Sequence, residues 1–180
     1  MLDEVPFVDL GGENGGFLTL VRQMHQDLTS KERYSLMQNP AMRCHVQGLV
    51  RSLLNYKPSS TLISGFKEIR LCNQEDLLFL EAAFPCARYV INYRMDVDKQ
   101  AKSGMYRKKP MMNETLRHRT EALLSFADRH SEQAFHAPLE QFSLDLMNQL
   151  LRWLDIQNCN LTTMLKRNKG GTYAKTEVQS

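Results

Sequence analysis

The chain begins with an apolar run, a glycine-rich turn and an amphipathic segment. Residues 4–10 (EVPFVDL) are mostly apolar and lead into residues 11–16 (GGENGG), a pattern typical of a strand followed by a tight turn. Apolar residues then recur at i, i+3, i+4, i+7 and i+11, the spacing of one helix face: Phe17, Leu20, Val21, Met24 and Leu28. The pattern therefore predicts a strand and then an amphipathic helix.

The next segments predict two more helices around a second strand. Residues 40–55 repeat the helical pattern, and residues 61–66 (TLISGF) have β character. Residues 73–83 (NQEDLLFLEAA) predict a helix, because Asn73 is a favoured N-cap residue and acids follow it in the first turn.

A third β-rich run, residues 87–93 (ARYVINY), follows this helix. Because a helix separates two strands within a short stretch, the segments 61–66 and 87–93 predict a βαβ crossover with parallel strands. Helical patterns complete the chain at residues 96–104, 113–130, 138–155 and 160–168. We therefore expect an α/β fold of three layers, with a parallel sheet between flanking helices.

The composition fits one soluble globular domain. The chain has 180 residues, of which 42% are hydrophobic, so we expect a single domain over residues 1–180. No apolar stretch approaches the length of a membrane span, and MLDEVPFVDL lacks the basic start of a signal peptide. The four cysteines show no CxxC pairing, which is typical of free thiols in a reducing compartment. We therefore expect a cytoplasmic protein without a membrane span.

Charge is unevenly distributed, although the net charge is only +3. Residues 88–119 hold nine Lys or Arg and three acids, and residues 166–175 hold four Lys or Arg and no acid. Two basic segments on an acidic remainder indicate a local anion site, for a phosphorylated small molecule or a nucleic-acid backbone. A solvated basic face is the alternative.

Arg94 is the most informative basic residue, because it directly follows the apolar run 87–93. In open parallel sheets, ligands bind at the carboxyl ends of the strands. Ser103 follows nine residues later, and its hydroxyl is able to bind a phosphate oxygen. The pair predicts a phosphate site, and the alternative for Arg94 is a surface ion pair.

Several stretches together resemble the sulfotransferase superfamily. These stretches are GGENGG at 11–16, GFKEIR at 65–70, FLEAAFPCARYVINYR at 79–94 with SG at 103–104, and RNKGG at 167–171. Members of this superfamily transfer a sulfuryl group from 3′-phosphoadenosine 5′-phosphosulfate, on a P-loop NTPase-like α/β fold. The resemblance implies the same cosubstrate, the same fold and no metal here.

The resemblance also implies which residues bind the cosubstrate. Arg94 and Ser103 would bind its 3′-phosphate, and Arg167, Gly170 and Gly171 would form a second contact to that phosphate. Glycines suit such a loop because backbone N–H groups then approach an anion closely. A basic tail is the alternative for this late loop.

The catalytic residues are implied less directly. A lysine near the transferring group is common in the superfamily, and Lys67 matches it; an ion pair with Glu68 or another acid is the alternative. The cytosolic branch has a histidine base two residues later, where this chain has Ile69. Glu13 and Glu68 are therefore the candidate bases, and a helix-start acid is the alternative for Glu13.

The superfamily's 5′-phosphosulfate loop is not found in the sequence. Only ten residues precede the GGENGG turn, and they contain no Gly, Ser, Thr or Lys. We therefore expect the chain to begin after this loop, with a fold incomplete at its N-terminus. The alternatives are a fragment or an incomplete gene model of a sulfotransferase that has the loop, and a degenerate relative that binds the nucleotide without catalysis. Met95 and Asp96 also depart from the common pattern, which has an acid and then a proline.

The acceptor is expected to be a small molecule or a carbohydrate bearing a hydroxyl or an amine. We do not expect nucleic acid as a partner, because few aromatic residues are interleaved with the basic ones. The alternative from another class is a non-catalytic nucleotide- or nucleic-acid-binding module that uses residues 88–119 and 166–175.

Overall fold

The computed structural model describes these residues of the chain: 2, 5, 8–11, 17–29, 39–54, 62–69, 73–102, 111–157, 159–163 and 178–179. Their contacts divide the chain into two units. We call Phe7–Ala87 the N-terminal unit, and Met1–Pro6 together with Arg88–Ser180 the C-terminal unit. The expectation of one domain over the whole chain stays a prediction.

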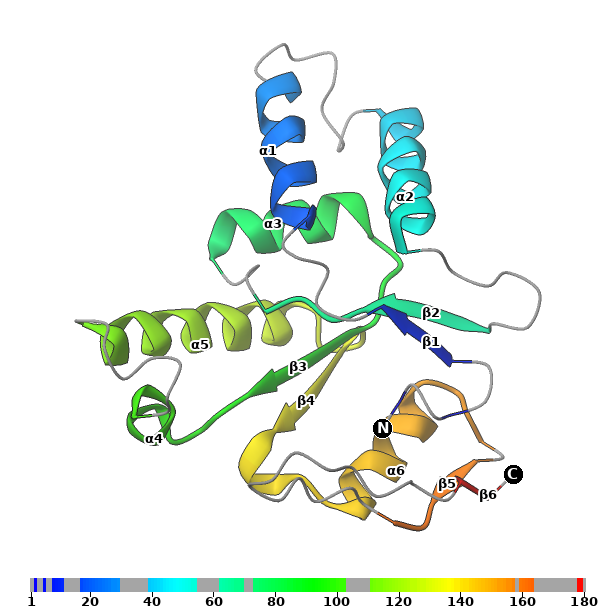
Figure 1. Cartoon of the computed structure of the whole chain (residues 1–180), viewed down its shortest axis with the longest axis vertical. Coiled ribbons are helices and arrows are strands. Elements are labelled where there is room, and N and C mark those ends of the chain that lie inside the picture. The colour runs from blue at the N-terminus through cyan, green and yellow to red at the C-terminus, as the bar shows by residue number, and fades with distance from the viewer. Residues whose placement is uncertain are drawn as a thin grey trace. The chain divides into compact units, whose positions relative to one another are not determined.

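The N-terminal unit contains one pair of parallel strands. β1 (Val8–Gly11) pairs with β2 (Ile63–Phe66), so that Val8 lies opposite Ile63 and Gly11 opposite Phe66 (Figure 1). The N–H of Lys67 donates to the carbonyl of Gly11 at 2.9 Å, which extends the ladder beyond β2. Both strands therefore end at the same edge.

Helices connect and flank these strands. α1 (Phe17–Thr29) and α2 (Pro40–Leu54) form the crossover between β1 and β2, and α3 (Gln74–Ala83) follows β2. The Asn73 side chain accepts a hydrogen bond from the Asp76 N–H at 2.8 Å, so the predicted N-cap is confirmed. The buried core residues of these helices include Leu18, Val21, Val46, Val50, Phe79 and Ala83.

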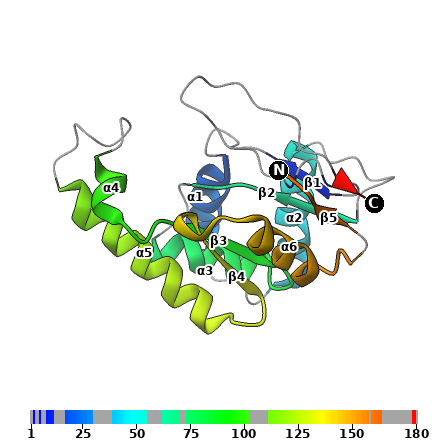
Figure 2. The same cartoon turned by 90° about the horizontal axis from the view of Figure 1, so that it is seen from below.

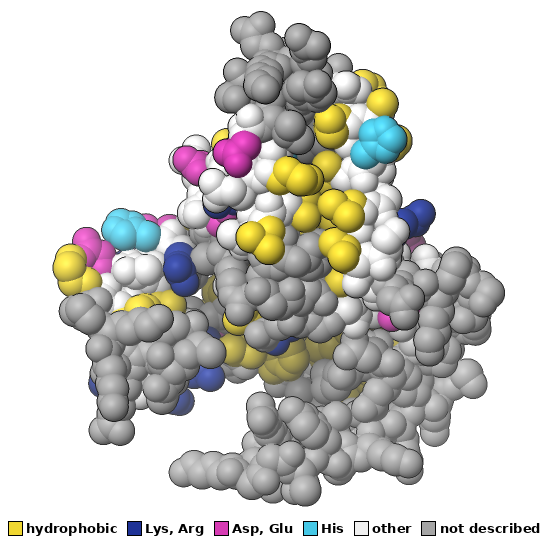
Figure 3. Space-filling model, turned by 45° about the horizontal axis from the view of Figure 1, so that its top comes forward, with side chains coloured by type: hydrophobic (Ala, Val, Ile, Leu, Met, Phe, Trp, Pro, Cys, Tyr) yellow, Lys and Arg dark blue, Asp and Glu magenta, His cyan; other side chains and the backbone are white. Residues whose placement is uncertain are grey.

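The buried face of α1 differs from the predicted stripe. Leu18 is fully buried and Val21 nearly so, whereas Leu20 is 71% exposed and Met24 is 46% exposed. Contacts with neighbouring helices select the row that contains Leu18 and Val21, because the apolar residues of α1 extend over more than one face. Figure 3 shows hydrophobic side chains gathered on the surface of this helical region.

The C-terminal unit contains a second pair of parallel strands. β3 (Tyr89–Tyr93) pairs with β4 (Ala134–Pro138) over five residues, from Tyr89 opposite Ala134 to Tyr93 opposite Pro138 (Figure 2). The crossover contains α4 (Val97–Ala101) and α5 (Met112–Arg129). The 3₁₀ helix η3 (Leu139–Gln141) and α6 (Leu144–Trp153) follow β4.

Helices contact both faces of this strand pair. Tyr89 packs edge-on against the fully buried Phe126 of α5, with ring centroids 4.9 Å apart. Phe135 lies one residue along β4 and therefore points to the other face, where its ring is 5.6 Å from that of Trp153 of α6. This unit thus places helix, strand pair and helix in successive layers.

The strand pairing corrects the predicted crossover. β2 pairs with β1 and β3 with β4, so the segments 61–66 and 87–93 are not shown as partners in the described part of the chain. These two pairs are nevertheless parallel, and helices connect their strands. The described structure is therefore of the α/β class.

Two predicted helical segments are wrong in part. The helix predicted over 138–155 begins only at Leu144, after the Ser143 side chain caps it by accepting from the Leu146 N–H at 3.2 Å. The residues before it form β4 and η3 instead, because pairing with β3 imposes the extended conformation. Asn160–Leu161 forms β5, antiparallel to β6 (Val178–Gln179), where a helix was predicted.

No helix in the described ranges is both long and apolar enough to cross a membrane. Three of the four cysteines are described, and all three are free: Cys44, Cys86 and Cys159.

Candidate anion-binding site

The carboxyl ends of β3 and β4 meet at one edge of the C-terminal unit. Arg94 directly follows β3, and Glu140 lies two residues after the end of β4. Because Tyr93 lies opposite Pro138 in the parallel register, the two strands deliver Arg94 and Glu140 to this same edge. Parallel sheets bind their ligands at such edges.

Arg94 is half-buried at this edge. No hydrogen bond or ion pair joins its guanidinium to any other residue that the structure describes. The surface ion pair considered as an alternative is therefore not found within the described part of the chain. A half-buried guanidinium whose donors are not used by any described residue is chemically suited to bind an anion.

Glu140 binds the backbone immediately after Arg94. One carboxylate oxygen accepts from the Met95 N–H at 3.0 Å, and the other accepts from the Asp96 N–H at 3.4 Å. The hydrogen bond from Met95 lowers the pKa of Glu140 most, and desolvation opposes it. The backbone N–H of Glu140 itself, the Asp96 N–H and the positive charge of Arg94 lower this pKa further. Sequence reasoning missed Glu140, because β4 itself was not predicted.

The acids that follow Arg94 accept hydrogen bonds from neighbouring groups of the fold. The Asp96 carboxylate caps α4 by accepting from the Lys99 N–H at 2.8 Å. Asp98 accepts from the Asn113 side chain at 2.9 Å and so ties α4 to α5. These bonds fix the segment after Arg94 on two sides.

Arg88, at the opposite end of β3, has a different environment. Its guanidinium lies 2.5 Å from Asp155, donates to the Trp153 carbonyl, and is 5.4 Å from the centre of the Trp153 ring. The charge of Arg88 is thus compensated within the fold. Residues 88–119 therefore offer less free positive charge than their composition indicates.

Lys67 and Glu68 lie at the carboxyl edge of the β1–β2 pair in the N-terminal unit. Lys67 is exposed, whereas Glu68 is half-buried and its Oε1 accepts from the Ile69 N–H at 2.9 Å. β1 also ends at this edge, with Gly11, two residues before Glu13 in the sequence. Glu13, Ser103, Arg167, Gly170 and Gly171 lie outside the described residues.

A hollow of about 290 Å³ lies between α1 and α3 of the N-terminal unit, and none of the predicted site residues lines it. It is lined by Arg22, His25, Gln26, Glu75, Leu78 and Phe79. Arg22 is already paired there, with its Nε 2.6 Å from Asp76 and its Nη1 3.5 Å from Glu75. Because its charges compensate one another, we assign this hollow a structural role.

Among the described residues, no group of three or more His, Cys, Asp or Glu side chains is placed to hold a metal ion. His118 is exposed on α5 and lies 3.8 Å from Glu114 and 3.5 Å from Glu121, as ordinary surface contacts.

Comparison of the chain with protein-family models, with curated proteins and with solved structures found no match.

Proposed function

We propose that the chain is the cosubstrate-binding domain of a sulfotransferase, in which Arg94 binds the 3′-phosphate of 3′-phosphoadenosine 5′-phosphosulfate. One observation carries the proposal: a half-buried arginine follows a parallel strand directly and makes no ion pair within the described residues. The proposed fold is the three-layer, P-loop NTPase-like fold of the superfamily. The α/β character and the helices on both faces of β3–β4 support it.

The chemistry of the two groups matches. A guanidinium presents parallel N–H donors that bind two phosphate oxygens at once, and it stays charged at every physiological pH. The carboxylates of Glu140 and Asp96 are hydrogen-bonded to backbone N–H groups and form no ion pair with the guanidinium, so its N–H donors are not used by these acids. Ser103, Arg167, Gly170 and Gly171 are proposed as further contacts to the phosphate.

The remaining roles follow the reaction. Lys67 would stabilise the negative charge that develops on the sulfuryl and leaving oxygens. Glu68 or Glu13 would remove the proton of an acceptor hydroxyl or amine on a small molecule or a carbohydrate. The support for these roles is that Lys67 and Glu68 follow β2 at the carboxyl edge of a parallel pair.

Calorimetric titration with adenosine 3′,5′-bisphosphate tests the proposal. Arg94→Ala is expected to weaken binding by roughly 10- to 100-fold, the size of one or two lost charge-assisted hydrogen bonds. Arg117→Ala is the matched control, because it removes the same charge from an exposed position on α5. The dissociation constant of the Arg117 variant is expected to stay within about twofold of the wild-type value, as for an exposed charge that solvent and salt screen.

The Arg117→Ala control also distinguishes the proposed phosphate site from a solvated basic face. Equal weakening by Arg94→Ala and Arg117→Ala would indicate a diffuse basic face and contradict the proposal. Indifference to the bisphosphate, together with strongly salt-dependent binding of a single-stranded oligonucleotide, would favour a nucleic-acid-binding module instead.

A further inference from the structure

Glu140 connects the segment that follows β4 to the segment that follows β3. It belongs to η3, directly after β4, and its two carboxylate oxygens accept from the N–H groups of Met95 and Asp96, directly after β3. The Glu140 side chain thus accepts hydrogen bonds from two consecutive backbone N–H groups in the turn after β3. The first of these donors belongs to the residue after Arg94.

We infer that Glu140 is a positioning residue for Arg94. By holding the Met95 and Asp96 N–H groups, its carboxylate fixes the turn from which the Arg94 side chain projects, and thereby places the guanidinium where the phosphate is bound. The inference rests on the proposed function, since it assigns the support of the same anion site. Asp96 completes the support by capping α4 from the other side of the turn.

The geometry distinguishes this positioning role from that of a carboxylate that would occupy the phosphate site on Arg94. A carboxylate that stood in for the phosphate would pair with the Arg94 guanidinium, and no such ion pair is found within the described residues. The hydrogen-bond donors to Glu140 are backbone groups of the turn instead. Glu140 therefore restrains the turn and leaves the guanidinium donors to the ligand.

The test compares Glu140→Ala with Glu140→Gln in the calorimetric titration. Both variants lose the same negative charge near Arg94, which by itself would tighten anion binding. Only glutamine keeps an oxygen at the same reach, so the difference between the two variants isolates the hydrogen-bond acceptor.

The alanine variant is expected to bind adenosine 3′,5′-bisphosphate roughly 10-fold more weakly than the glutamine variant, the effect typical of losing a residue that orients a ligand-binding group. Equal affinities of the two variants, whether above or below the wild-type value, would overturn the inference. So would tighter binding by the alanine variant.

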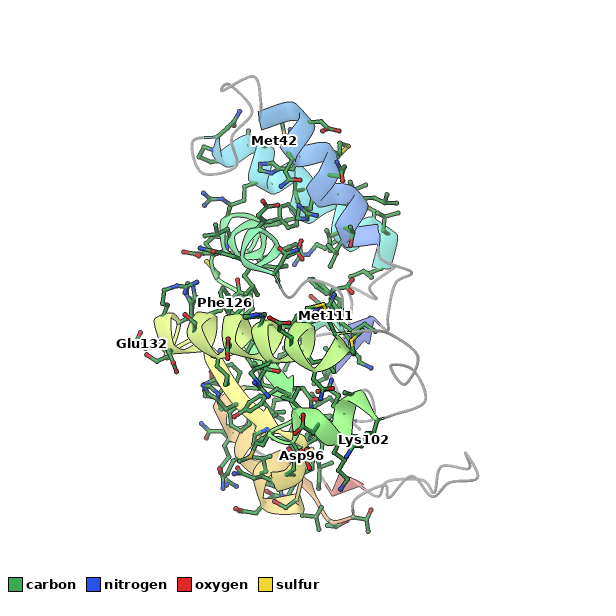
Figure 4. All side chains as sticks on the ribbon, turned by 90° about the vertical axis from the view of Figure 1, so that its left-hand side faces the viewer. Met42, Asp96, Lys102, Met111, Phe126 and Glu132 are labelled. Atoms are coloured by element: carbon green, nitrogen blue, oxygen red, sulfur yellow. The ribbon has the colours of Figure 1, made fainter. Side chains whose placement is uncertain are left out.

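Glu132→Ala is the control for charge alone. Glu132 is exposed and precedes β4, whereas Glu140 follows it, and the five-residue strand between them spans about 16 Å. Figure 4 shows Glu132 beyond the end of α5, apart from Asp96 and Lys102 at the ends of α4. The Glu132 variant is expected to bind the bisphosphate as the wild type does.

An NMR titration tests the contact without any ligand. The amide signal of Met95, which donates the shorter hydrogen bond to Glu140, is expected to shift as the Glu140 carboxyl titrates, at a pH below the usual range for glutamate because the pKa of Glu140 is lowered. This shift is expected to vanish in Glu140→Gln. Its persistence there would show that another group holds the turn, and would overturn the inference.

The failures of the two proposals are distinguishable. If the wild type does not bind the bisphosphate, or if Arg94→Ala binds it equally well, the proposed function fails and the inference fails with it. If Arg94→Ala weakens binding and the two Glu140 variants bind equally, only the positioning role fails.

Discussion

Arg22 and Arg94 show two uses of the same side chain. Arg22 of α1 is buried except for 13% of its side chain, and its guanidinium lies 2.6 Å from Asp76 and 3.5 Å from Glu75 in α3. Arg94 has no ion pair with any described residue of the chain. The first arginine is therefore held by partners inside the fold, whereas the second is the one that we propose binds an anion.

The two secondary-structure contexts explain the difference. Glu75 and Asp76 in the first turn of α3 stabilise the positive end of the helix dipole. They also lie within ion-pair distance of Arg22 of α1. Arg94 instead follows a strand, at an edge where the neighbouring carboxylate of Glu140 is held by backbone N–H groups. The ion-paired Arg22 thus contributes to stability, whereas Arg94 is half-buried without an ion pair among the described residues and is the arginine that we propose for binding.

The largest effect is expected from Arg22→Ala. The substitution leaves Asp76, which is only 3% exposed, as a buried charge without its guanidinium, and should lower the free energy of unfolding by about 3 kcal/mol or more. Urea denaturation measures this loss. The double variant Arg22→Met with Asp76→Leu should recover most of it, and no recovery would contradict the ion-pair explanation.

A smaller effect is expected from Arg88→Ala. This arginine pairs with Asp155, but the side chains are 42% and 70% exposed, and solvent therefore weakens the pair. Together with the lost contact to Trp153, the free energy of unfolding should fall by about 1 kcal/mol. Urea denaturation in low and high salt measures both parts, and a loss as large as that of Arg22→Ala would contradict the distinction.

His25 offers a pH test of the environment around Arg22. Burial lowers the pKa of His25, which lines the same hollow as Arg22 and Glu75. The unfolded chain therefore binds the proton more readily, so this contribution to stability is present above the unfolded pKa of about 6.5 and is lost as pH falls from there through the folded pKa.

The His25→Gln variant should consequently lose less stability than the wild type between about pH 7.5 and about pH 5.5. Thermal unfolding measured across this range tests the effect, with the His45→Gln variant as control because His45 is exposed. Parallel curves for wild type and His25→Gln would show that burial does not penalise the charged form.

The smallest effect on stability is expected from Arg94→Ala. Because Arg94 makes no ion pair within the described residues, the free energy of unfolding should change by less than about 0.5 kcal/mol, as for most surface substitutions. The same variant should bind the bisphosphate more weakly, so the two measurements separate stability from function. A large loss of stability would instead place Arg94 among the structural arginines.

Local sequence patterns predicted much of the secondary structure. The Asn73 cap and the acids after it marked the start of α3, and β-branched and aromatic residues marked β3. The Arg94 position at a strand end also followed from the sequence, because a fixed charge directly after an apolar run is a local feature. These signals act between neighbours in the chain.

Long-range contacts decided the rest. The sequence by itself determined that helices alternate with strands and that a guanidinium follows the strand 89–93. Only the tertiary structure decided that β3 pairs with β4, that Arg22 forms an ion pair with Asp76, and that Glu140 accepts a hydrogen bond from the turn after Arg94. The physical reason is that each of these facts depends on residues far apart in sequence, whose meeting is set by strand register and helix packing and not by local preference.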